Sequence, residues 1–138
     1  MRPGGLTALS IFNFVFGGLG GLAGLIGIAT LGMTYQHNAE QAAKMGLAFP
    51  SQGVQYALMT VAIVRAALLI TAAIGYLGMR KFLGRAIGNT YAVVALGSIV
   101  LEISLARTSF TAFNLVDFVF PLITLFLLNA VFRKDLVR

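Results

Sequence analysis

The chain has 138 residues, of which 59% are hydrophobic and only 10% are charged, and its formal net charge is +6. In soluble domains about a quarter of all residues are charged. This composition therefore excludes an ordinary soluble protein and indicates an integral membrane protein of one domain. The positive charge does not indicate a nucleic acid partner, because most Lys and Arg residues border apolar runs, as in a membrane topology signal.

The first apolar run, about residues 6–31, predicts a membrane-spanning helix. It is too long for the apolar region of a cleaved secretory signal, so we expect a retained span. Glycine lets helix backbones approach closely in lipid, so small residues that share one side of this helix predict tight packing, either on another subunit or on the chain's own helices. They recur at alternating steps of three and four and form a helix-packing seam: Ser10, Asn13, Gly17, Gly20, Gly24 and Gly27.

Residues 32–53 form the longest polar connection and are expected outside the membrane. Good helix formers, and a Glu and a Lys four residues apart, predict that residues 34–45 continue the first helix and that it ends near Gly46. A second helix is expected to start at Pro50-Ser51. His37 has no second histidine, cysteine or carboxylate cluster around it in the sequence, so we interpret it as an interfacial side chain rather than a metal ligand or pH sensor.

The second apolar run, about residues 56–79, predicts a span with Arg65 in its middle. A tight basic turn is expected at residues 80–85, followed by a third span at about 86–105 and, after a short loop, a fourth at about 115–132. Four long apolar helices joined in this order predict an all-α integral membrane bundle of four transmembrane helices, built as two antiparallel hairpins.

The basic residues outside the spans predict the orientation of the bundle. Cytoplasmic loops carry an excess of Lys and Arg, so the side with more of them is expected to face the cytoplasm. That side holds both termini and the turn after the second span. It carries seven basic residues against two on the other side: Arg2, Arg80, Lys81, Arg85, Arg133, Lys134 and Arg138, against Lys44 and Arg107.

Three charged residues lie within the predicted spans, and we expect them to form an intramembrane charge cluster: Arg65, Glu102 and Asp117. Counting from the basic end of each span at 1.5 Å per residue places them at similar depths, about 22 to 26 Å into the membrane. Pro121 supports a polar centre here, because a proline leaves the carbonyl four residues earlier, that of Asp117, without its helical donor.

This cluster has two interpretations. In the first it is an ion or proton pathway, in which one arginine faces two acids and the surplus acid exchanges its proton. In the second it is a structural polar clamp, with Arg107 as an additional partner that reaches inward. We favour the clamp, because its charges then balance and the first two spans offer mainly apolar side chains beyond this level.

Enzymatic interpretations have little support in the sequence. The chain has no cysteine, no serine paired with a histidine, and no His-carboxylate spacing that would bind a metal, so we expect no catalytic residues, no metal and no cofactor. The glycines of the first span do not follow a strand and lack the lysine of a phosphate-binding loop. A bound pigment or quinone is neither supported nor excluded by the sequence.

Three segments resemble small bacterial four-span inner-membrane proteins of uncharacterised function. They are residues 2–9 (RPGGLTAL), residues 75–78 (GYLG) and residues 120–125 (FPLITL). The resemblance implies a multi-pass protein of the bacterial inner (cytoplasmic) membrane. From the residues themselves we infer a non-enzymatic subunit or scaffold that assembles with copies of itself or within a larger membrane complex. The alternative is a small ion- or proton-coupled transporter or channel that uses the charge cluster.

Overall fold

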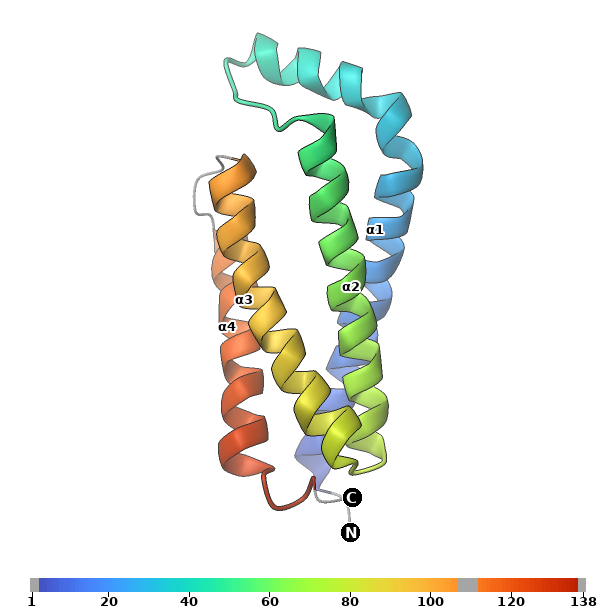
Figure 1. Ribbon diagram of the computed structural model, residues 1–138, viewed down its shortest axis with the longest axis vertical. Helices are drawn as coiled ribbons and strands as arrows, with labels where there is room; N and C mark the ends of the chain where they lie inside the picture. Colours follow the sequence, from blue (N-terminus) through green and yellow to red (C-terminus); the bar gives the residue numbers. More distant parts are fainter. Residues whose placement is uncertain (1–2, 107–111, 137–138) are drawn as a thin grey trace.

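The computed structural model describes residues 3–106 and 112–136, and the regular secondary structure in this part of the chain is all helical (Figure 1). The prediction of an all-α fold is therefore confirmed. Its elements in order are α1 (Gly4–Lys44), α2 (Gln52–Leu77), η1 (Lys81–Ala86), α3 (Ile87–Ala106), α4 (Ala112–Phe126) and η2 (Leu127–Val131), where η1 and η2 are short π-helical segments. Three helical segments, Gly4–Lys44, Gln52–Leu77 and Lys81–Leu105, are long and apolar enough to cross a membrane, and Leu115–Val131 is a shorter apolar helix.

The predicted continuation of the first helix through residues 34–45 is confirmed, because α1 runs without a break to Lys44. Its end is fixed by Gly46, whose φ of +67° is a conformation that glycine adopts without strain. The Gly46 N–H donates to the Ala43 carbonyl at 3.0 Å, and the Leu47 N–H donates to the Ala42 carbonyl at 2.9 Å. This pair of hydrogen bonds is the Schellman arrangement, which satisfies carbonyls that a helix end leaves free.

Near its end α1 bends, and its last turns run across the bundle beyond the start of α2 (Figure 1). Two threonine hydroxyls in the second half of α1 bond to its backbone. Thr30 Oγ1 donates to the Ile26 carbonyl at 2.9 Å, and Thr34 Oγ1 donates to the Thr30 carbonyl at 3.2 Å. Such bonds compete with the backbone ladder and often bend helices.

The start of α2 is confirmed as predicted: Ser51 is its N-cap, and its side chain accepts a hydrogen bond from the Val54 N–H at 3.3 Å. The predicted basic turn at residues 80–85 is wrong in its extent, because Lys81–Ala86 already forms the helical segment η1. The chain reverses within three residues instead. Met79 adopts a φ of 50°, and the Arg80 N–H donates to the Gly75 carbonyl at 2.9 Å, which closes α2 tightly.

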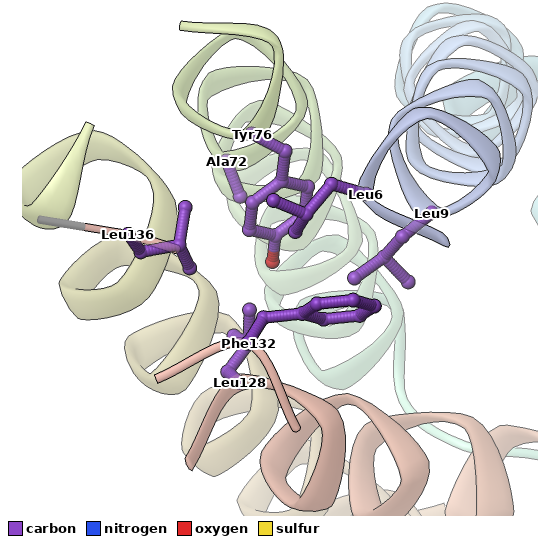
Figure 2. Packing of buried hydrophobic residues seen from close by; sticks show 7 residues of the cluster. All are labelled: Leu6, Leu9, Ala72, Tyr76, Leu128, Phe132 and Leu136. Atoms are coloured by element: carbon purple, nitrogen blue, oxygen red, sulfur yellow. The ribbon is translucent and has the colours of Figure 1, made fainter. Parts of the chain in front are cut away.

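The hydrophobic core is concentrated at the end of the bundle that carries both termini. Side chains from the start of α1, the end of α2 and the end of the chain point to a common centre there (Figure 2): Leu6, Leu9, Ala72, Tyr76, Leu128, Phe132 and Leu136. A second cluster lies one level further along: Leu69, Tyr91, Ala92 and Ala95. Beyond it α2 and α3 diverge, so that α1 stays with α2 and α3 stays with α4 (Figure 1).

Candidate functional site

Three glycines of the seam on α1 face α2 of the same chain. A Cβ atom at Gly17 would lie 3.1 Å from the Ala66 carbonyl oxygen, and one at Gly24 would lie 2.8 Å from the Ile63 side chain. At Gly27 the nearest neighbour, a Met59 sulfur, would lie at 3.0 Å. These glycines therefore allow α1 to pack closely against another helix of the same chain.

The polar members of the seam lie deeper in the bundle and are fully buried. Ser10 Oγ donates to the Leu6 carbonyl at 2.8 Å and approaches the Ala73 carbonyl of α2 at 3.3 Å. The Asn13 side chain lies beside the Tyr76 hydroxyl, yet neither group is in hydrogen-bonding geometry with any described residue. Because a buried amide without partners is costly, Asn13 and Tyr76 mark a polar site within the apolar core.

Gly20, the remaining seam residue, has no neighbour within 4 Å of the position a Cβ would take, and it faces open space. That space is a cavity of about 320 Å³ bounded by α1, α2, α3 and α4. We call it the Arg65 cavity. Its lining is mostly apolar and aromatic: Phe16, Leu19, Gly20, Ala62, Arg65, Ala66, Leu69, Tyr91, Val116, Asp117 and Phe120.

Of the described residues that line this cavity, only Arg65 and Asp117 are charged. The Arg65 side chain is half-buried, whereas Asp117 is exposed. Tyr91 of α3 is buried and lines the same cavity, and it interacts electrostatically with Arg65 and more weakly with Asp117. The structure thus brings two of the three predicted cluster residues into one cavity and adds a tyrosine that the sequence analysis did not include.

Aromatic rings form one wall of the Arg65 cavity. The Phe120 ring lies 5.5 Å from the Phe16 ring and 6.3 Å from the Tyr91 ring, measured between centroids. These spacings are typical of tilted and edge-on aromatic pairs, which hold each other in fixed orientations. The wall therefore restrains the Tyr91 ring, which lines the cavity together with Arg65 and Asp117.

Glu102 is not among the described residues that line this cavity. It lies on the part of α3 that has diverged from α2, eleven residues beyond Tyr91 in the chain (Figure 1). Counting residues estimated its depth but took no account of the direction of α3. Arg107, the additional partner in the clamp hypothesis, lies outside the described residues.

The sequence pattern could have pointed to Tyr91. It shares one helix face with Ala95, Ser98 and Glu102, at spacings of four, three and four, and this face is mildly polar. Polar groups continue from it toward the termini. The Tyr76 hydroxyl interacts electrostatically with Tyr91 and lies beside Asn13. Sequence alone could not show that polar residues from three different helices come close enough to interact.

The chemistry available in the Arg65 cavity consists of one cation, one carboxylate and one phenol within an aromatic wall. Such groups can pair with a polar group of a partner or pass a proton. In the part of the chain that the structure describes, no three His, Asp or Glu side chains gather into a set that could hold a metal ion. No family model, curated protein or solved structure matches the chain.

Proposed function

We propose that the protein is a non-enzymatic integral membrane subunit that assembles through close helix packing with copies of itself or within a larger membrane complex. One observation best supports this proposal. Asp117, which belongs to an apolar helix and lines the same cavity as Arg65, is exposed. A charged side chain exposed to hydrocarbon is costly, and such groups usually face protein. A partner that covers the open side of the Arg65 cavity would remove this cost.

The proposed membrane arrangement has four spans, with both termini in the cytoplasm of a bacterial cell and the bilayer as the surrounding partner. The fourth span consists of α4 and η2, residues 112–131, whose twenty residues reach about 30 Å, the thickness of the hydrocarbon core. The orientation rests on the excess of basic residues around the termini and at residues 80–85.

We place the assembly surface at Gly20 and the mouth of the Arg65 cavity rather than along the whole glycine seam. Gly17 and Gly24 already contact α2, so they are not available to another subunit. Gly20 has open space above it and lines the cavity. A small residue at this position allows a neighbouring helix or side chain to approach the backbone of α1 closely.

Two valines of equal exposure provide the test. Val116 lines the Arg65 cavity and is 65% exposed, whereas Val93 lies on α3 outside the cavity lining and is 64% exposed. A photoreactive amino acid is placed at each position in turn in intact membranes. The proposal predicts a discrete protein adduct from position 116 and only lipid adducts from position 93. Lipid adducts alone from both positions would contradict it.

A second candidate, a small proton- or ion-coupled transporter, is favoured by one observation. The buried polar groups of Tyr91, Tyr76 and Asn13 extend from the Arg65 cavity toward the end that carries the termini. Purified protein in liposomes tests this candidate through proton flux. Flux that is lost in Asp117→Asn and Tyr91→Phe would support transport, whereas assembly predicts no flux in the wild type or in either variant.

A further inference from the structure

A second cavity, of about 500 Å³, lies where η1 joins α3, at the end of the bundle that carries the termini. Its lining differs from that of the Arg65 cavity, because it combines two cations, an amide and an exposed aromatic ring. We call it the basic cavity. It is lined by Lys81, Phe82, Arg85, Ala86 and Asn89.

The Arg85 guanidinium in this cavity is held in place by neutral groups. Its Nε and one terminal nitrogen donate to the Asn129 side-chain oxygen at 3.3 and 3.2 Å. Asn129 is itself fixed, since its amide nitrogen donates to the Asn89 side-chain oxygen and to the Leu125 carbonyl, both at 2.9 Å. An amide oxygen orients an arginine without cancelling its charge, so the guanidinium keeps a full positive charge and donors for an anion.

No described residue that lines the basic cavity is acidic, and Lys81 adds a second positive charge. Phe82, one position further along, is 69% exposed. Cations beside an exposed aromatic ring at the end of an apolar helix are typical of the boundary between lipid headgroups and acyl chains. This neighbourhood favours a ligand that has both an anionic group and an apolar part.

We propose that the basic cavity binds the headgroup phosphate of an anionic phospholipid. Lys81 and Arg85 contact the phosphate, Asn129 is a positioning residue for Arg85, and Phe82 lies among the acyl chains. Basic pockets at the cytoplasmic ends of membrane helices are suited to such headgroups, because the inner leaflet is rich in anionic lipid. The inference is independent of subunit assembly, since the basic cavity shares no lining residue with the Arg65 cavity.

The test uses the full chain in lipid nanodiscs of phosphatidylcholine containing a minor fraction of phosphatidylglycerol. Native mass spectrometry then measures how many of each lipid the released protein retains. The wild type is expected to retain phosphatidylglycerol in clear excess over its share of the bilayer, and Arg85→Gln is expected to lower that preference about tenfold, the value of one charge-assisted hydrogen bond.

Asn129→Asp is the sharpest variant, because it leaves Arg85 in place but gives it a carboxylate partner. It is expected to lower the preference as much as Arg85→Gln does. Lys134→Gln is the matched control: Lys134 is exposed near the same end and does not line the cavity, so its loss removes the same charge without effect on retention. Lys81→Gln changes an exposed side chain of the same cavity, so it is expected to lower the preference without affecting folding.

Three results would overturn the inference. Equal losses in Lys134→Gln and Arg85→Gln would indicate diffuse attraction between a basic protein and anionic lipid. If Asn129→Asp retained as much phosphatidylglycerol as the wild type, the charge of Arg85 would not determine lipid binding. Displacement of the lipid by millimolar inorganic phosphate would identify the site as one for a free anion rather than for a phospholipid.

Discussion

Gly75 of α2 and Gly84 of η1 contact each other backbone to backbone. A Cβ atom at Gly75 would lie 2.6 Å from the Gly84 Cα and would overlap the Gly84 nitrogen. This contact brings the end of α2 and the start of the following helix so close that neither position has room for a larger residue. It fixes the three-residue reversal between them and places the Tyr76 side chain of α2 against Gly88 of α3.

Gly75→Ala is therefore expected to destabilise the protein by about 3 kcal/mol, because the backbone of η1 must move to make room. Gly97→Ala is the control, since Gly97 has nothing within 4 Å of its Cβ position and lies inside α3. It should be neutral or slightly stabilising, by up to about 1 kcal/mol. Unfolding of the detergent-solubilised protein by temperature or sodium dodecyl sulfate measures both effects, and equal stability of the two variants would contradict the contact.

The same substitution is expected to have opposite effects at two glycines that both face open space. Gly46→Ala should destabilise the end of α1 by about 1 kcal/mol, because φ at Gly46 is +67° and alanine is strained there. Gly53→Ala should stabilise the start of α2 by about 0.5 kcal/mol, because alanine favours the helix. Hydrogen exchange of residues 42–47 and 52–56 separates the two effects, and faster exchange in both variants would rule out this explanation.

Arg65 is expected to be coupled energetically to Asp117 and not to Glu102. Arg65→Leu leaves Asp117 as the one charged side chain among the described residues that line the cavity, so adding Asp117→Asn should recover about 1 kcal/mol or more of the lost stability. Adding Glu102→Gln should give an additive loss, since Glu102 does not line the Arg65 cavity. Two double-mutant cycles of unfolding free energy measure these couplings. A larger coupling to Glu102 than to Asp117 would contradict the placement of these residues.

The proposed orientation predicts which introduced cysteines an impermeant thiol reagent reaches from outside the cell. Asn38→Cys lies in the exposed last turns of α1 and should react, whereas Phe82→Cys at the opposite end should not. The sequence prediction adds Ser109→Cys to the reactive set. Labelling of intact cells tests the orientation, and reaction at position 82 alone would reverse it.

The sequence predicted those features of the fold that depend on local chemistry. Gly46 ends α1 and Ser51 starts α2 because a positive φ and an N-cap each require particular residue types. The glycine spacing on α1 predicted a close contact, but the choice between α2 and another subunit depends on three-dimensional packing. In the structure α2 packs against Gly17 and Gly24.

Features that depend on the direction of a helix were harder to predict. Counting residues placed Arg65, Glu102 and Asp117 at similar depths, yet depth does not specify on which side of a helix a residue lies or how that helix tilts. Because α3 diverges from α2 (Figure 1), Tyr91 rather than Glu102 lines the cavity with Arg65. The basic residues after α2 were assigned to a turn, since nothing in their composition shows that Gly75 and Gly84 allow so short a reversal.

The native mass of the protein in nanodiscs drawn directly from the membrane tests the assembly proposal most directly. The wild type is expected to be heavier than one chain of 14.6 kDa. Gly20→Leu should reduce it to a single folded chain, because the leucine occupies the cavity mouth and its Cβ position has no neighbour within 4 Å. Gly18→Leu, also in open space but outside the cavity lining, should keep the wild-type mass. A wild type of one chain, or a Gly20→Leu complex of unchanged mass, would contradict the account.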